Sequence, residues 1–186
     1  MPGKDGIKVI QVKNLTKKYD DKTAVNNISF QVYPGVVTGF LGPNGAGKST
    51  TIRMILNLAK PTAGNVTVDG KAYSTLDNPL KKIGAMVDAN AIDSRLTPRQ
   101  YLRILSTASG LDKRKVEEIL SFVGLSNVKN KVIGKFSFGM RQRLGLAAAL
   151  IGDPETIILD EPFNGLDVDG IHWLRAILCD FAKQGY

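Results

Sequence analysis

The chain of 186 residues contains one cysteine and one histidine, and no apolar run in it approaches the 18 or more residues of a membrane span. The single Cys179 cannot form an internal disulfide, which suits the cytosol. No apolar segment follows residues 1–6, so the N-terminus does not have the pattern of a secretory signal. Internal repeats and low-complexity segments are missing too. With 43% apolar and 23% charged residues, we expect a soluble globular protein with a full core, built as one domain or as one domain with a small subdomain.

The net charge is +8, from 25 basic and 17 acidic residues. Lysines gather near the N-terminus, and the other basic residues are scattered. No basic patch interleaved with aromatic side chains accompanies them, so we expect a solvated surface and no nucleic-acid partner.

The most informative segment is a glycine-rich stretch that fits the phosphate-loop pattern G-x-x-x-x-G-K-[ST]. An apolar run at residues 36–41 predicts a buried strand before it, and residues 51–58 predict a helix after it. In such a loop, backbone N–H groups and a helix N-terminus surround phosphate oxygens. Lys48 is expected to reach the β- and γ-phosphates, and Ser49 to bind Mg²⁺. The stretch consists of Gly42, Pro43, Asn44, Gly45, Ala46, Gly47, Lys48 and Ser49, followed by Thr50.

The rest of the pattern predicts an α/β protein in three segments. Residues 1–90 combine short antiparallel strands with the phosphate-loop unit. Residues 91–135 form an inserted helical subdomain, whose first helix begins at a cap formed by residues 97–100. Residues 136–186 hold a buried helix, an apolar strand at 156–159 and a last helix with one apolar face.

Two adjacent carboxylates, Asp160 and Glu161, follow that apolar strand. In a parallel sheet this is the edge where ligands bind. Asp160 is expected to hold Mg²⁺ directly or through water, and Glu161 to orient and polarise an attacking water. Because Asp-Glu-Pro is also good turn chemistry, the hypothesis depends on the phosphate loop upstream.

Together these motifs make the chain similar to the ATP-binding subunit of an ABC transporter, from about Ile7 to the end. The resemblance implies a P-loop NTPase core with an antiparallel β subdomain and an inserted α-helical subdomain. It makes residues 42–49 the Walker A loop, Asp160 the end of Walker B and Glu161 the catalytic carboxylate. Tyr19 matches the aromatic residue that stacks on adenine. Residues 164–167, which end at Asp167, resemble the D-loop at the dimer interface.

Residues 136–140, Phe-Ser-Phe-Gly-Met, stand where the family has its Leu-Ser-Gly-Gly-Gln signature. By this resemblance, Ser137 and Gly139 bind the γ-phosphate of an ATP molecule held by a second cassette in a head-to-tail dimer. Phe138 replaces a glycine of the signature, and we interpret it as subfamily variation that keeps the function.

Two further departures concern the catalytic groups. Asp88 stands where the family has a glutamine that touches Mg²⁺ and the water, so by resemblance it belongs to the metal and catalytic sites. A carboxylate there resembles bacitracin- and lantibiotic-type exporter cassettes. The family continues beyond Tyr186 with another strand and a switch histidine, whereas His172 is expected at the surface. We therefore expect a truncated chain that binds ATP but hydrolyses it weakly or not at all.

The resemblance implies ATP and Mg²⁺ as cofactors, polytopic membrane subunits as partners and a place at the cytoplasmic face of the cell membrane. Its expected function is to power export of a drug or antimicrobial peptide. One alternative is a non-transport ABC ATPase of DNA repair or translation, although the chain lacks a long coiled coil between Lys48 and Ser137. A phosphate-loop GTPase or kinase is the other, although residues 130–133 lack the Asp of a guanine-binding motif.

Overall fold

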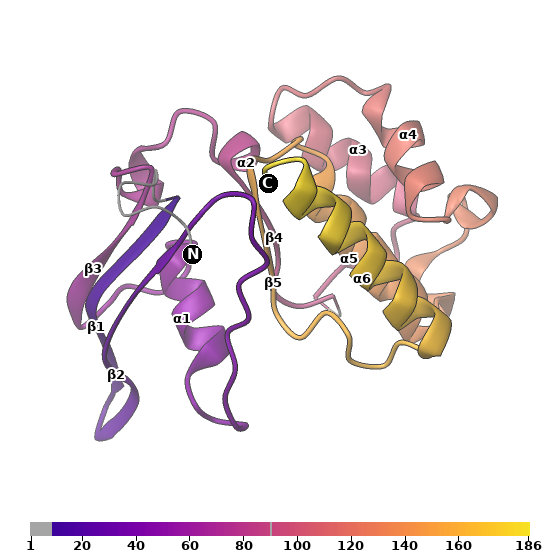
Figure 1. Cartoon of the computed structure of the whole chain (residues 1–186). Coiled ribbons are helices and arrows are strands. Elements are labelled where there is room, and N and C mark those ends of the chain that lie inside the picture. The colour runs from indigo at the N-terminus through magenta and orange to yellow at the C-terminus, as the bar shows by residue number, and fades with distance from the viewer. Residues whose placement is uncertain (1–8, 90) are drawn as a thin grey trace. The chain divides into compact units, whose positions relative to one another are not determined.

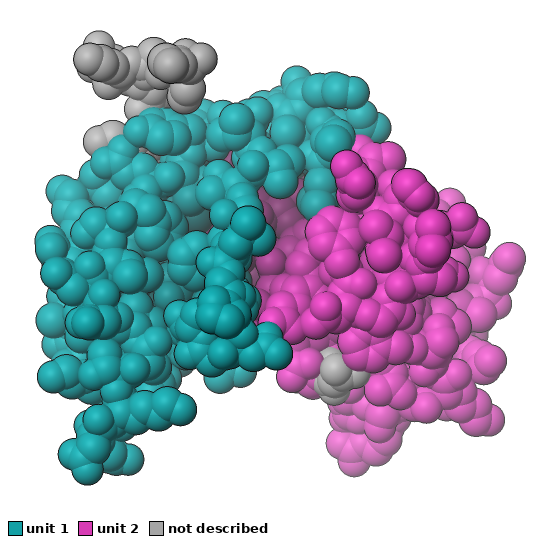
Figure 2. All heavy atoms as spheres, turned by 60° about the horizontal axis from the view of Figure 1, so that its bottom comes forward, with its two compact units in different colours: residues 1–79, 178–186 teal, residues 80–177 magenta. Residues whose placement is uncertain are grey.

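The structure is a computed structural model that describes residues 9–89 and 91–186. It separates into two compact units, Met1–Pro79 with Leu178–Tyr186, and Leu80–Ile177. Figure 2 colours them teal and magenta. Each unit is described by itself below, as unit 1 and unit 2. The division into residues 1–90, 91–135 and 136–186 stays a prediction.

Unit 1 contains an antiparallel sheet with the strand order β2-β1-β3 (Figure 1). The strands are β1 (Ile10–Tyr19), β2 (Lys22–Val32) and β3 (Ala63–Val68). A tight turn joins β1 to β2, and Asp20 adopts the left-handed conformation there. The buried apolar residues of the sheet are Ile10, Val12, Leu15, Val25 and Val68. The predicted antiparallel pairing is confirmed, although β1 and β2, with 10 and 11 residues, are not short.

The predicted buried strand at residues 36–41 is wrong. These residues form no strand in the described structure, and the side chains of Val37 and Leu41 are 61% and 92% exposed. A buried strand needs backbone partners along its edges. In unit 1 the three strands pair only with one another, so the apolar run has no ladder to join. Only Phe40 gains an aromatic neighbour, with its ring 5.4 Å from that of Phe30.

Unit 2 contains a parallel pair of strands, β4 (Ile83–Met86) and β5 (Thr156–Leu159). The helix α5 (Phe138–Leu150) packs against this pair, with Ala149 beside Met86 in one buried cluster. The helix can approach closely because β4 carries Gly84, where a Cβ would overlap the carbonyl oxygen of Ala149. Deep burial of this small-residue helix, expected from the sequence, is confirmed.

Unit 2 also holds the helices α3 (Pro98–Ala108) and α4 (Lys115–Phe122). The Thr97 hydroxyl accepts a hydrogen bond from Gln100 N, and the Gln100 side chain accepts one from Thr97 N. This capping box confirms the predicted helix start. The fully buried side chains that join the two helices include Leu102, Val116 and Leu120.

The remaining elements are short, apart from α6. They are α1 (Lys48–Ile55), η1 (Tyr73–Thr75), α2 (Pro79–Lys82), η2 (Ser126–Val128), η3 (Ile133–Lys135) and α6 (Val168–Lys183). Among the described residues, no helix combines the length and apolar character needed to cross a membrane.

An ion-pair network on α4 gives a pH-dependent contribution to stability. The Glu117 carboxylate lies 2.7 Å from Arg99 Nε and accepts a 2.8 Å hydrogen bond from Lys129 Nζ. Interactions with Arg99 and then Lys129 lower the pKa of Glu117 to about 2. Because this pKa is below the ordinary value of 4.5, the stabilisation is complete above about pH 4.5 and is lost as the pH falls toward 2.

We expect Glu117→Gln to lower the free energy of unfolding at pH 7 by about 0.5–1 kcal/mol, since the side chain is 41% exposed and solvent screens the pairs. Urea unfolding at pH 7 and at pH 3 measures the effect, which should shrink at the lower pH and in high salt. Glu118→Gln, on the same helix and exposed, is the matched control. A loss that is independent of both pH and salt would show that packing, not charge, is responsible.

Candidate functional site

The phosphate loop lies in unit 1 and leads directly into α1. Gly45 and Gly47 have φ values of 82° and 85°, a region that other residues enter only with strain. At Gly47, a Cβ would also overlap the carbonyl oxygen of Ala24 in β2. Glycine at position 47 therefore permits both the left-handed turn and the close contact with the sheet. The residues of the loop from Gly42 to Ala46 are exposed.

The Lys48 side chain bends back over this loop. Its Nζ donates hydrogen bonds to the carbonyl oxygens of Gly42, at 2.7 Å, and Pro43, at 3.0 Å. A lysine ammonium has three donors, so a further acceptor can bind it. Ser49 and Thr50 follow in the first turn of α1, and both are partly exposed. The loop thus holds a cation beside the N-terminus of a helix, which suits a phosphate group.

Tyr19 lies at the end of β1, in the same unit as the phosphate loop. Its side chain is 48% exposed, and Lys17 Nζ lies 4.7 Å from the centre of its ring. Tyr19 pairs with Lys22 across the hairpin, and Ala24, which contacts Gly47, is two residues further along β2. Tyr19 and Ala24 therefore belong to the same hairpin, and Ala24 is the residue of that hairpin that approaches the loop.

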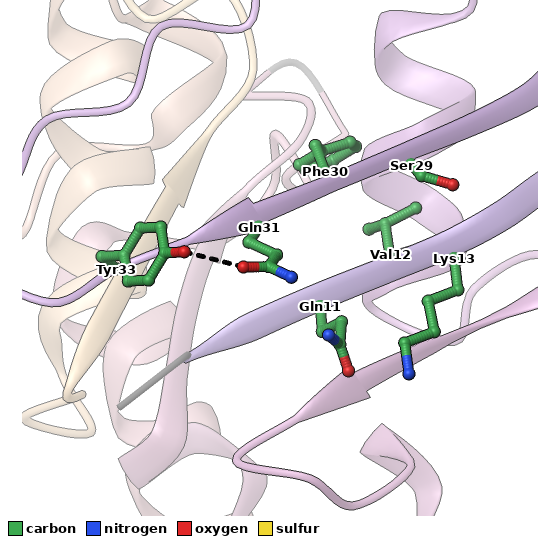
Figure 3. Close-up of a pocket in the computed structure, with 7 residues that line it drawn as sticks. All are labelled: Gln11, Val12, Lys13, Ser29, Phe30, Gln31 and Tyr33. Atoms are coloured by element: carbon green, nitrogen blue, oxygen red, sulfur yellow. Dashed lines mark hydrogen bonds between the residues drawn. The ribbon is translucent and has the colours of Figure 1, made fainter. Parts of the chain in front are cut away.

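A separate pocket of unit 1 lies on β1 and β2 (Figure 3). The Tyr33 hydroxyl donates a 2.7 Å hydrogen bond to Gln31 Oε1 at its edge. Among the residues that line it, Lys13 alone is charged. This pocket lacks the convergent cationic groups that a phosphate site needs.

In unit 2, three carboxylates follow the ends of the parallel strands. Met86 pairs with Leu159, and Asp160 N extends the ladder by donating a 2.8 Å hydrogen bond to Met86 O. Asp88 therefore follows β4 at the same edge where Asp160 and Glu161 follow β5. Carboxylate oxygens that lie together at one edge of a sheet are suitable ligands for Mg²⁺. Among the described residues, no group of three or more His, Cys, Asp or Glu side chains forms a metal cluster.

Glu161 has a φ of 48°, which is uncommon for a residue with a side chain. Its Oε2 accepts a 2.6 Å hydrogen bond from Asn164 Nδ2. The sequence does not indicate this contact, because Asn164 matches only the D-loop segment there. The available signal was an asparagine three residues after Glu161 in a turn-forming stretch.

The signature segment begins α5. The Ser137 hydroxyl caps this helix by accepting a 3.2 Å hydrogen bond from Met140 N, and its own proton can still be donated. At Gly139, a Cβ would lie 3.6 Å from Leu166 Cδ2, an ordinary contact. Packing within the chain therefore does not require glycine at position 139. The Phe138 side chain is 40% exposed, and its ring contacts Gly165.

Asp167 and His172 lie just before and within α6. The Asp167 carboxylate accepts a 2.8 Å hydrogen bond from Gly170 N, which satisfies the first turn of α6. His172 is exposed on α6, as expected.

The phosphate loop with Tyr19 belongs to unit 1, and the carboxylates and the signature belong to unit 2. The structure therefore describes two separate groups of predicted site residues.

The chain is similar to known proteins over most of its length. The ABC transporter family profile matches residues 25–164. A bacitracin transport ATP-binding protein, BcrA of Bacillus licheniformis, is 42% identical over 95% of this chain and 58% of its own length. A lantibiotic transport ATP-binding protein, SrtF of Streptococcus pyogenes, is 36% identical over 95% of this chain and 76% of its own length.

Solved structures agree as well. The ATP-binding subunit of an ABC transporter is 29% identical, with a TM-score of 0.82, and the match covers 95% of this chain and 76% of that one. A dimeric bacterial ABC transporter cassette is 25% identical, with a TM-score of 0.85 over 94% of this chain and 83% of that one. The fold is that of an α/β P-loop NTPase of the ABC ATPase type. The chain spans 58% of the length of the bacitracin relatives. The chain belongs to the ABC transporter family.

Proposed function

We propose that this chain is the ATP-binding cassette of an ABC exporter, which binds and hydrolyses ATP to move a drug or antimicrobial peptide across a membrane. The phosphate loop is the observation that supports nucleotide binding. Gly45 and Gly47 give it left-handed turns, and the Lys48 ammonium lies against its carbonyl oxygens. The identity with bacitracin and lantibiotic transport proteins supports the export part.

In the proposed site, Lys48 exchanges its two loop carbonyls for oxygens of the β- and γ-phosphates. Backbone N–H groups of the loop and of the start of α1 bind the remaining phosphate oxygens. Tyr19 stacks on the adenine ring. The residues that line the phosphates in this proposal are Gly42, Pro43, Asn44, Gly45, Ala46, Gly47, Lys48, Ser49 and Thr50.

Ser49, Asp160 and Asp88 offer the hydroxyl and carboxylate oxygens that fit Mg²⁺, which when bound neutralises charge on the phosphates. Glu161 holds the attacking water and accepts its proton. Asp88 is shorter than the glutamine it replaces, and we propose that it also couples the site to the membrane subunit.

The signature residues act on a second cassette. Ser137 can donate its hydroxyl proton while capping α5, and Gly139 has no steric role within its own chain. Both observations support binding of a γ-phosphate held by a partner cassette in a head-to-tail dimer. Asp167 would then lie at the dimer interface. A dimeric cassette among the similar structures supports this arrangement.

The chain by itself is proposed to bind ATP but to hydrolyse it weakly or not at all. Residues 36–41 lead into the phosphate loop without a strand partner in the described structure. Polytopic membrane subunits supply the transport path and hold the cassette at the cytoplasmic face of the membrane.

Co-purification tests the transport proposal. The protein, tagged in its host, is isolated from detergent-solubilised membranes, and its partners are identified and quantified by mass. We expect a polytopic membrane protein in matched amounts, absent when an unrelated soluble protein carries the tag. Recovery of soluble partners only, such as ribosomal or DNA-associated proteins, would favour a non-transport ABC ATPase.

A further inference from the structure

The turn after β5 connects the proposed general base to Asn164. Asn164 N donates a 3.2 Å hydrogen bond to Glu161 O and closes the turn, while Asn164 Nδ2 donates one of 2.6 Å to Glu161 Oε2. Both the backbone and the carboxylate of Glu161 are thus held by one residue. The second carboxylate oxygen, Oε1, is left to act on a water.

Two residues of the signature helix α5 contact the same turn. Gln142, 8% exposed, places Nε2 at 3.5 Å from Asn164 O, a long hydrogen bond. The Phe138 ring covers Gly165, where a Cβ would lie 2.7 Å from Phe138 Cε1. One polar and one apolar contact therefore fix the turn to the helix that begins with the proposed γ-phosphate ligand Ser137.

We propose that Asn164 is a positioning residue for hydrolysis, which orients the Glu161 carboxylate and connects it to the signature helix through Gln142 and Phe138. This inference rests on the proposed function, because it assigns Glu161 as the base. A glutamate side chain has three rotatable bonds and loses considerable conformational entropy when held in one position. The amide of Asn164 holds it before the water arrives.

The chemistry of asparagine suits this task. A carboxamide donates to the carboxylate without bringing a second negative charge beside it, and without adding a competing base. Its effect should appear in the chemical step and not in nucleotide binding, since its side chain donates to the carboxylate proposed as the base.

The test uses the protein as its host makes it, with its partners. Asn164→Ala removes the donor, and Asn164→Ser restores a shorter one. We expect Asn164→Ala to lower kcat for ATP hydrolysis about tenfold, with KM for ATP within twofold of the wild type. Asn164→Ser should recover part of the lost kcat. Asn127→Ala, an exposed asparagine of unit 2, is the matched control and should change neither constant.

Gln142→Leu tests the link to the signature helix, because it keeps a buried side chain but loses the amide. It should lower kcat several-fold with little change in KM. Unchanged kcat in Asn164→Ala would overturn the inference, as would a loss that Ser does not relieve or one that comes with weakened ATP binding. Absence of ATP hydrolysis in the wild type would instead overturn the proposed function.

Discussion

Lys48→Ala is expected to lower the affinity for ATP by about 100-fold. The Lys48 ammonium lies within the phosphate loop, where it donates to two carbonyl oxygens of the loop itself. In the proposed complex it donates to phosphate oxygens, and hydrogen bonds that involve a charged group contribute about 1.5–3 kcal/mol each. Since about 1.4 kcal/mol corresponds to a tenfold change in Kd, one or two such bonds account for the expected loss. Titration calorimetry with ATP and Mg²⁺ measures it.

A control variant tests whether the loss of ATP affinity depends on the position of the lost charge or only on the net charge. Lys71→Ala removes an exposed lysine of unit 1 in the turn after β3 and changes the net charge equally. It should leave the affinity unchanged, and thermal unfolding should show that both variants keep the wild-type fold. Equal affinity of Lys48→Ala and the wild type would remove the phosphate-loop assignment.

Local chemistry could be predicted from the sequence wherever the determinants are neighbours in the chain. The cap at Thr97 and Gln100 needs only a hydroxyl and an amide three residues apart, and both hydrogen bonds are present. The strands β4 and β5 are apolar runs in the sequence, and they pair in parallel in the structure. The helix expected at residues 51–58 is present as α1, Lys48–Ile55, but it begins and ends three residues earlier, and Asn57 beyond its end has a left-handed φ of 57°.

Residues 36–41 show where this reasoning fails. An apolar run indicates that burying the segment is energetically favourable. It does not show whether neighbouring strands are present to form hydrogen bonds with its backbone. Strand formation depends on partners that are distant in sequence. In the described structure these partners are missing, so Val37 and Leu41 stay exposed.

Phe138 shows a second limit, which concerns pairs of side chains. In the sequence it stands as a bulky replacement of a signature glycine. The structure shows that its ring occupies the space that Gly165 leaves open in the D-loop. The two positions are 27 residues apart, and neither alone indicates the contact. The same holds for Gln142 and Asn164, which meet only after α5 and the turn have folded.

The second large effect is expected for Glu161→Gln in the protein as its host makes it, with its partners. The substitution should lower kcat for ATP hydrolysis by about 1,000-fold while ATP binding persists. Glutamine has the same shape and its carbonyl oxygen can still accept the Asn164 hydrogen bond, but it cannot take a proton from water. General base catalysis contributes about 10²–10⁴-fold to the rate. With hydrolysis blocked, the ATP-bound head-to-tail dimer should accumulate. Phosphate release measures kcat, and light scattering on a sizing column with ATP and Mg²⁺ measures the dimer.

Glu118→Gln removes the same charge from an exposed position on α4 and should leave both measurements unchanged. The two readouts test different parts of the proposal. A Glu161→Gln variant that hydrolyses ATP at the wild-type rate would show that another group is the base. A variant that is inactive but stays monomeric with ATP would keep Glu161 as the base and remove the head-to-tail dimer. In that case, Ser137 and Gly139 would lose their proposed ligand, and the cap of α5 would suffice to explain Ser137.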